Sequence, residues 1–220
     1  MIVGAPRSGT TLLCSLMAAT NRLGRPGEFF NEDAKEFANP HGPDDTAHRL
    51  TVARKSATAN GVLALKLFPG HLDRAMADLH LWEFFPEPAF VRVTRRDLLR
   101  QAISLARAWQ TDQWNSLAPG ARAQPVYSSD AIERGLALIT NENAQWDRFF
   151  ARYQVSPMMV EYEDLEQRAA NIVQIIADLA KVELETIPTI DDSPLTVQRD
   201  DLTEQWREAF LAEGRRLERI

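Results

Sequence analysis

Residues 1–17 read Met1-Ile-Val-Gly-Ala-Pro-Arg-Ser-Gly-Thr-Thr-Leu-Leu-Cys-Ser-Leu-Met17, and this stretch decides the fold. Its apolar start predicts a short strand over Ile2–Ala5, and its apolar end predicts a helix that begins at Thr10. The residues between them form a glycine-containing loop. Such a loop gathers backbone N–H groups at the positive end of the helix dipole. The stretch therefore predicts a binding site for an anion such as phosphate.

The loop has the glycine spacing of a nucleotide P-loop but lacks its lysine. Gly4 and Gly9 match the motif Gly-x-x-x-x-Gly-x-Thr, while Thr10 takes the place of the Walker lysine, so an ATP-type γ-phosphate site is not expected. Arg7 brings a full positive charge. An ordinary corner with an exposed arginine is the alternative, and the run of loop-forming and anion-binding residue types disfavours it. The anion-binding candidates are Pro6, Arg7, Ser8, Gly9, Thr10 and Thr11.

A second segment, Phe90-Val-Arg-Val-Thr-Arg-Arg-Asp97, also joins a predicted strand to a predicted helix. Arg95 and Arg96 lie just before that helix, where the positive end of the dipole prefers carboxylates to cations. Two arginines at such a place need a counter-anion. Asp97 could supply this anion through an ion pair at the helix cap. For this segment alone, such an ion pair explains the arginines as well as a bound ligand does. Together with the first loop, the segment favours a phosphate.

Apolar runs alternate with helical patterns along the chain, which predicts an α/β fold with a P-loop-like parallel sheet flanked by helices. The expected strands are Ile2–Ala5, Val62–Phe68, Ala89–Thr94 and Pro157–Tyr162. The expected helices are Thr10–Ala19, His71–Leu81, Asp97–Trp114, Asp130–Tyr153, Glu163–Val182 and Asp201–Arg219. Two loop-rich stretches, Gly24–Pro43 and Ser116–Ser129, are expected to form the substrate pocket together with the helix over 97–114.

Both charged segments resemble the sulfotransferases that use 3′-phosphoadenosine-5′-phosphosulfate (PAPS). In that family a loop like Pro6–Leu13, with a basic residue at the position of Arg7, holds the 5′-phosphosulfate. An arginine followed eight residues later by a serine holds the 3′-phosphate, and Arg96 and Ser104 have this spacing. The resemblance implies the sulfotransferase fold, PAPS as sulfuryl donor and an acceptor hydroxyl. Three further segments point to the bacterial branch of the family found in mycobacteria: Gly24–Phe30, Ala108–Trp114 and Val197–Trp206.

Glu28 is the candidate general base for this chemistry. It follows the stiff turn Gly24-Arg-Pro-Gly27 and precedes two phenylalanines, and apolar surroundings raise the pKa of a carboxyl group toward the working range of a base. Without the resemblance a solvated loop residue would be the better interpretation, but the resemblance implies a glutamate base here. Arg7 would stabilise the departing phosphate as an electrostatic clamp. Many family members have lysine at that position, so the protonation of the leaving group stays open.

Three other residues have weaker support. Lys66 interrupts an apolar strand pattern, so its ammonium group is expected to emerge at the strand end or reach a partner, within reach of a sulfate. His71 matches the catalytic histidine of the animal branch only loosely, and a surface position is preferred for it. Arg199 matches a cofactor-side loop of the bacterial branch that would reach the 3′-phosphate, and an exposed cap residue is an equal alternative.

The acceptor is less well defined than the donor. Trp109, Gln110 and Trp114 can stack on and hydrogen-bond to a sugar, and partial core packing of the tryptophans is an equal alternative. The resemblance favours a carbohydrate, while a lipid-linked glycan or a small alcohol is also compatible. Two other function classes stay open, a P-loop kinase with an altered loop and a nucleotide-binding module without chemistry. Thr10 argues against the kinase, and Glu28 argues against the module.

Composition limits the partners. The 220 residues carry a net charge of −6, so broad binding to nucleic acid or anionic lipid is not expected. A content of 45% hydrophobic and 25% charged residues is typical of one globular domain, here spanning 1–220. No apolar run approaches the ~18 residues of a membrane span, and the start lacks signal-peptide features, so a cytoplasmic enzyme without membrane insertion is expected. One cysteine and four scattered histidines predict no disulfide and no metal, and a homodimer is compatible with the resemblance.

Overall fold

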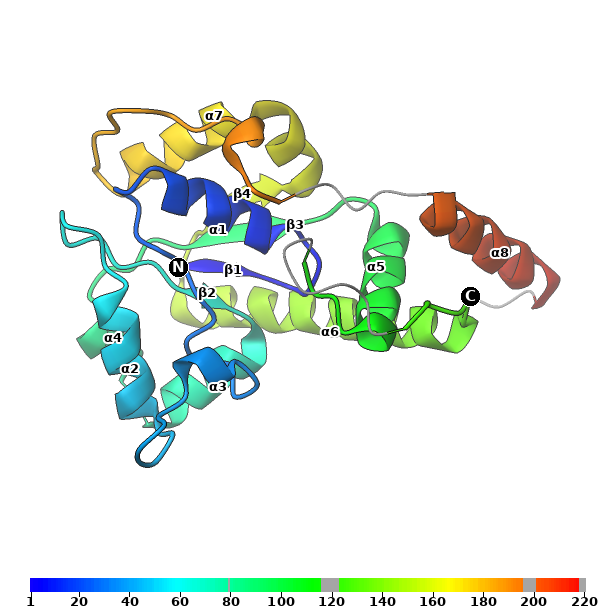
Figure 1. Ribbon diagram of the computed structural model, residues 1–220, viewed down its shortest axis with the longest axis horizontal. Helices are drawn as coiled ribbons and strands as arrows, with labels where there is room; N and C mark the ends of the chain where they lie inside the picture. Colours follow the sequence, from blue (N-terminus) through cyan, green and yellow to red (C-terminus); the bar gives the residue numbers. More distant parts are fainter. Residues whose placement is uncertain (79, 116–122, 196–200, 218–220) are drawn as a thin grey trace.

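The computed structural model describes residues 1–78, 80–115, 123–195 and 201–217. Within these ranges four strands form one parallel sheet in the order β2-β1-β3-β4 (Figure 1). The strands are β1 (Ile2–Gly4), β2 (Lys66–Leu67), β3 (Val91–Thr94) and β4 (Met158–Glu161). The predicted α/β class with a parallel sheet is confirmed.

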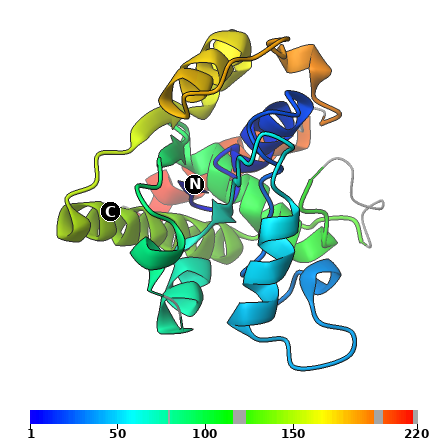
Figure 2. The same cartoon turned by 90° about the vertical axis from the view of Figure 1, so that its left-hand side faces the viewer.

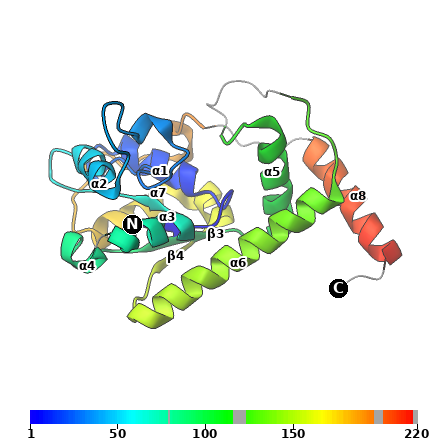
Figure 3. The ribbon, with the colours of Figure 1, turned by 90° about the horizontal axis from the view of Figure 1, so that it is seen from below.

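Helices cover both faces of this sheet. α1 (Thr10–Ala19) and α7 (Tyr162–Leu179) lie over one face, and α6 (Ser129–Tyr153) runs along the other, as the upper and lower layers of Figure 2 show. α5 (Leu98–Thr111) stands at the carboxyl ends of the strands, against α6 (Figures 1 and 3). The other helices are α2 (Thr46–Lys55), α3 (Pro69–Asp78), α4 (Leu81–Phe84) and α8 (Asp201–Leu217), with 3-10 turns at Lys35–Phe37 and Ile190–Asp192. None of the described helices combines the length and the apolar character that crossing a bilayer requires.

The alternation of side chains along β1 and β3 separates two parts of the core. Ile2 and Val93 face α1 and α7, whereas Val3 and Phe90 face α3 and α6. This is the period of two that a strand imposes on its side chains. Because both faces of the sheet are covered, β1 consists of consecutive apolar residues, whereas β3 carries the buried Arg92 between its two valines.

Trp146 fixes α6 to the strand end at which the P-loop begins. Its ring is buried at 1% exposure and stacks on Phe150, with 5.8 Å between the ring centroids. Its Nε1 donates a hydrogen bond of 2.8 Å to the carbonyl oxygen of Gly4, the last residue of β1. The long helix below the sheet therefore holds the start of the P-loop in place.

The stretch 24–43 contains more structure than a plain loop. Its Gly27 forms an isolated parallel bridge with Leu65, next to β2. Arg49 of α2 is completely buried, and its Nη1 donates to the carbonyl oxygens of Phe29, Asn31 and Ala34 at 3.2, 2.8 and 3.1 Å. The rest of the guanidinium pairs with the carboxylate of Asp44. One arginine thus fastens the main chain around Glu28 to α2.

The expected elements differ from the observed ones mainly where local signals are weak. α2 was not expected, because its mean hydropathy is low and its start depends on the cap that Asp45 makes with the N–H of His48. The expected strand Val62–Phe68 is only two residues long, since it is the edge of the sheet. α5 begins one residue later than expected because Asp97 caps it, accepting from the Arg100 N–H at 2.9 Å. Asp97 also pairs with Arg100, so the proposed ion pair at this cap exists with a different arginine.

Candidate active site

The loop that joins β1 to α1 has the features of an anion site. Gly9, the N-cap residue directly before α1, has a left-handed backbone with φ of 100°, and Arg7 is also left-handed with φ of 63°. No side chain caps the start of α1 and its first turn holds no acidic residue, so the N–H groups there can bind a ligand. Ser8 is buried at 1% exposure, and its hydroxyl has no hydrogen-bond partner among the described residues. A buried hydroxyl without a partner is costly, so these features together fit a bound anion.

Gly9 has no room for a side chain. A Cβ atom there would lie 2.6 Å from Cδ2 of Tyr162, in a backbone conformation that L-residues rarely adopt. Gly9→Ala is therefore expected to lower the free energy of unfolding by about 1–2 kcal/mol, measured by urea denaturation. Gly214→Ala is the control, because nothing lies within 4 Å of a new Cβ there and alanine favours the helix interior. A Gly9→Ala variant as stable as the wild type would contradict the strained conformation.

Arg7 extends from this loop onto α5. Its Nε donates to Oγ of Ser104 at 2.8 Å, and its Nη1 donates to the carbonyl oxygen of Trp114. Burial and the charges of Arg95 and Arg107 lower the pKa of Arg7 to about 10, so the guanidinium is still charged at neutral pH. Several arginines therefore share one neighbourhood at the carboxyl ends of β1 and β3, which favours an anionic ligand.

Glu28 and Lys66 form a largely buried ion pair beside the same loop. Glu28 Oε1 lies 2.7 Å from Lys66 Nζ, which also donates to Oγ1 of Thr11 at 2.8 Å. The N–H of Lys66 donates to the carbonyl oxygen of Gly27 at 3.0 Å, and this aligns Glu28 with β2. Burial raises the pKa of Glu28, but the charge and hydrogen bond of Lys66 and a 2.8 Å hydrogen bond from Asn31 outweigh it. The expected rise in the pKa of Glu28 is therefore wrong: its pKa is below the usual value, and the carboxylate is ionised at neutral pH.

His71 lies beside this pair at the start of α3. Its Nδ1 accepts from the N–H of Phe68 at 3.4 Å. Burial lowers the pKa of His71 against the opposing effect of the Glu28 carboxylate, so the imidazole is neutral at physiological pH. His71 is half-buried and so less exposed than expected, because α3 begins directly after β2 and brings this side chain near Glu28.

Arg96 and Ser104 have separate partners. The Arg96 side chain pairs with carboxylates at the end of β4 and the start of α7, at 2.8 Å to Glu161, 3.6 Å to Glu163 and 3.3 Å to Asp164. Glu163 also accepts from the two backbone N–H groups that precede α5, at 3.2 and 3.4 Å. Ser104 instead accepts from Arg7. A phosphate at Arg96 would have to compete with these carboxylates.

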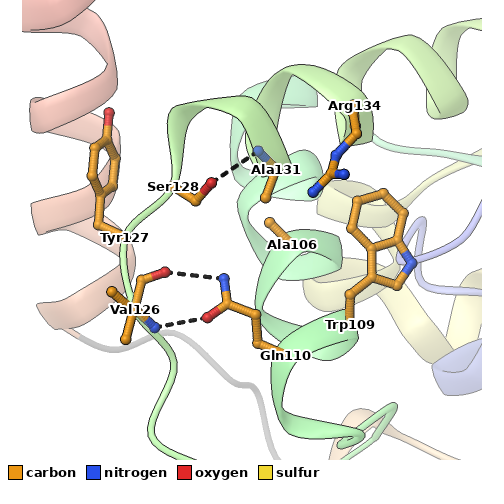
Figure 4. A pocket seen from close by; sticks show the side chains of 8 residues that line it. All are labelled: Ala106, Trp109, Gln110, Val126, Tyr127, Ser128, Ala131 and Arg134. Atoms are coloured by element: carbon orange, nitrogen blue, oxygen red, sulfur yellow. Dashed lines mark hydrogen bonds between the residues drawn. The ribbon is translucent and has the colours of Figure 1, made fainter.

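Trp109 and Gln110 line a cavity of about 410 Å³ between α5, α6 and the segment 126–128 (Figure 4). Gln110 Nε2 donates to the carbonyl oxygen of Val126 at 3.0 Å, and its Oε1 accepts from the Val126 N–H at 2.8 Å. Trp109 follows Ser104 by five residues, which places it roughly 140° around the axis of α5. Trp109 therefore faces away from the contact between Arg7 and α5.

Trp114 lies closer to the P-loop than these two residues. It follows the end of α5, its carbonyl oxygen accepts from Arg7, and its ring Nε1 donates to Asp112 at 3.1 Å. The side chain is 44% exposed. Of the three predicted sugar-binding residues, all of them described, Trp114 is the one whose main chain contacts the P-loop.

The comparison with family models decides the family. The model described as Stf0 sulphotransferase matches residues 1–66 and 62–213. The chain belongs to the Stf0 sulfotransferase family. The resemblance expected from its two charged segments is confirmed, and as a Stf0 sulfotransferase the protein is a transferase.

Two curated relatives of this Stf0 sulfotransferase are named trehalose 2-sulfotransferase. One, from Mycobacterium tuberculosis (strain ATCC 35801 / TMC 107 / Erdman), is 26% identical over 263 aligned positions, covering 99% of this chain and 96% of the relative. The other, from Mycolicibacterium smegmatis (strain ATCC 700084 / mc(2)155), is 22% identical over 258 positions, covering 98% and 95%. A crystal structure of a sulfotransferase from Alicyclobacillus acidocaldarius matches with a TM-score of 0.50 and 17% identity, covering 99% of this chain and 92% of that one. This likeness confirms the predicted fold.

Some residues at this Stf0 sulfotransferase site were not predicted. Asn31, three residues after Glu28 in the same stretch, gave no signal of its own. Arg95 was expected near an anion, but its contact was not predicted: its guanidinium lies 4.8 Å above the ring of Tyr162, which in turn closes against Gly9. Arg199, predicted for the 3′-phosphate, falls in 196–200, outside the described residues. Within the described part of the chain, no three His, Cys, Asp or Glu side chains gather as metal ligands would.

Proposed function

We propose that this Stf0 sulfotransferase transfers a sulfuryl group from PAPS to a hydroxyl of a carbohydrate. The observation that carries the proposal is the neighbourhood at the carboxyl ends of β1 and β2, where Lys66 links the uncapped start of α1 to the ionised Glu28. Sulfuryl transfer needs donors for an anion and a base for a hydroxyl, and both occur here. The name of the two curated relatives supports a sugar acceptor.

The proposed donor site extends from the P-loop to α5. The buried Ser8 hydroxyl and the uncapped helix start fit the 5′-phosphosulfate of PAPS. On the other side, Arg96 would exchange a carboxylate such as Glu161 for the 3′-phosphate. The residues proposed to hold the donor are Pro6, Arg7, Ser8, Gly9, Thr10, Thr11, Arg96, Ser104 and Arg199.

The proposed mechanism is an in-line displacement in which two side chains have separate roles. Bound PAPS supplies an electrophilic sulfur with a phosphate leaving group. Glu28 accepts the proton of the acceptor hydroxyl while the oxygen of that hydroxyl bonds to sulfur. Arg7 stabilises the charge that remains on the phosphate oxygen when the old sulfur–oxygen bond breaks. Because Arg7 stays protonated at neutral pH, it acts as a clamp and gives up no proton.

A tryptophan pair tests where the acceptor binds. Trp114→Ala is expected to raise KM for trehalose by about 3–10-fold with little change in kcat, because an exposed ring near the P-loop can stack on a sugar. Trp109→Ala is expected to change KM less, since Trp109 faces the separate cavity. Steady-state kinetics at saturating PAPS gives both values. The reverse order of effects would place the acceptor in the cavity of Figure 4.

A transfer assay tests the function itself. The protein is incubated with sulfur-35-labelled PAPS and a panel of sugars that includes trehalose, and label in the sugar is expected together with 3′-phosphoadenosine 5′-phosphate (PAP). Binding of PAP without transfer to any acceptor would favour the nucleotide-binding module. Transfer of the γ-phosphate of ATP would favour the kinase.

A further inference from the structure

Lys66 is a buried cation placed between the two halves of the proposed site. It is 7% exposed, and its ammonium group lies 2.7 Å from Glu28 Oε1, 2.8 Å from Thr11 Oγ1 and 5.3 Å from the centre of the Phe68 ring. Burying a lysine is costly unless its charge is compensated, and the carboxylate provides that compensation in the free protein. The Lys66 ammonium therefore needs an anionic partner, and in this structure the Glu28 carboxylate is that partner.

The P-loop offers Lys66 a second anion when a donor is bound. Thr11 is the second residue of α1, so the hydroxyl that Lys66 contacts belongs to the helix turn that would hold the phosphosulfate. Arg7 is bonded on the other side, to Ser104 and to the main chain at Trp114. Lys66 is thus the cation that this structure places between the anion site and the carboxylate.

We propose that Lys66 is a catalytic residue that couples donor binding to activation of the base. In the free enzyme it holds Glu28, and in the donor complex it moves to the sulfuryl oxygens and leaves the carboxylate free for the acceptor hydroxyl. In the step that follows, the acceptor oxygen bonds to sulfur and its proton passes to Glu28. The bond from sulfur to the bridging oxygen breaks, the electron pair stays on the phosphate, and Lys66 and Arg7 face the resulting charge. This proposal rests on the proposed function and goes beyond it.

The groups around Glu28 define the signal to be measured. Lys66 faces Glu28 from β2, His71 from α3 and Cys14 from α1. Burial raises the pKa of the Cys14 thiol to about 12, so the thiol is neutral. The Lys66 ammonium is the charged group among them at neutral pH. If it leaves, burial dominates, and the pKa of Glu28 rises by about one unit or more.

A carbon-13 NMR titration of the Glu28 carboxyl tests this coupling without turnover. The signal is assigned from its loss in Glu28→Gln, and the probes are PAP alone and PAP with inorganic sulfate. We expect the pKa of Glu28 to rise by about one unit with PAP and sulfate, and by less with PAP alone. In Lys66→Met the pKa is expected to be high already and to respond less to sulfate. An unchanged pKa in the wild type with PAP and sulfate would overturn the proposal.

Kinetics of Lys66 variants supply the second test. Lys66→Met is expected to lower kcat by about 10²-fold and to raise KM for PAPS, while PAP affinity stays within about threefold because PAP lacks the sulfuryl group. Lys66→Arg keeps the charge and is expected to recover part of kcat. Lys55→Met, at the exposed end of α2, is the control. If Lys66→Met does not fold, the wild-type titration and Lys66→Arg decide.

The outcomes separate the two proposals. A wild-type protein that binds PAP and shows the Glu28 shift but sulfates no sugar would contradict the proposed function and leave the Lys66 coupling in place. A wild-type enzyme that sulfates trehalose while Lys66→Met retains full kcat would uphold the function and overturn the coupling.

Discussion

Replacing Glu28 by glutamine is expected to lower turnover by about 10²-fold or more while PAP affinity stays within about threefold. The amide keeps the size of the side chain and can still accept from Lys66 Nζ and occupy the position beside Asn31, but it cannot take a proton. Because Glu28 is connected to the P-loop through Lys66 and is not itself part of the loop, the loss should fall on kcat. Initial rates at saturating PAPS and calorimetric titration with PAP measure the two effects.

Glu36→Gln is the matched control for this substitution. Glu36 belongs to the same stretch and is exposed, and replacing it by glutamine removes the same negative charge. It is expected to retain wild-type turnover. Equal rates for Glu28→Gln and Glu36→Gln would remove Glu28 from the mechanism.

Replacing Arg7 by methionine is expected to impair both donor binding and turnover, with kcat lowered by about 10²–10³-fold. The guanidinium carries the positive charge of the P-loop, and its hydrogen bonds to Ser104 of α5 and to the main chain at Trp114 hold the loop against that helix and the segment that follows it. Arg7→Lys keeps the positive charge, but its single ammonium nitrogen cannot donate to both Ser104 and the Trp114 carbonyl oxygen as the guanidinium does. A partial recovery of kcat and of PAP affinity relative to Arg7→Met is therefore expected. The PAP dissociation constant and kcat are the measurements.

Arg148→Met, an exposed change on α6, controls for the loss of one positive charge. It is expected to leave PAP affinity unchanged at moderate ionic strength. An Arg7→Met variant that binds PAP and turns over like Arg148→Met would show that the backbone of the P-loop suffices for the anion. Thermal unfolding of both variants checks that they are folded.

The fold was largely readable from the sequence because its deciding signals are local. The strand, loop and helix from Ile2 to Ala19 follow from consecutive residues, and the other strands are short, mainly apolar segments between helical patterns. α2 was missed because its stability comes from Arg49 buried against a distant stretch of main chain, which no periodicity reveals. Tertiary contacts of this kind override weak local propensity.

The candidate site was only partly readable because its pairs are far apart in the chain. The contact between Glu28 and Lys66 joins residues on either side of α2, and its single sequence signal was a lysine in an apolar run. The family spacing predicted Ser104 and Arg96 as joint ligands of a 3′-phosphate, but it gave no sign that Arg7 reaches Ser104 across the carboxyl ends of the strands. The acidic start of α7 that binds Arg96 was explained by the helix dipole alone. Sequence spacing fixes positions along one helix, and it does not fix which neighbour approaches from another.

The buried guanidinium of Arg49 has a consequence for redesign of the enzyme. It donates to three carbonyl oxygens that follow Glu28, and carbonyl oxygens are present whatever side chains the stretch carries. Exposed positions of that stretch can therefore be randomised or exchanged between homologues while the scaffold under Glu28 stays in register. A library confined to those positions is the natural starting point for directing sulfation to new acceptors.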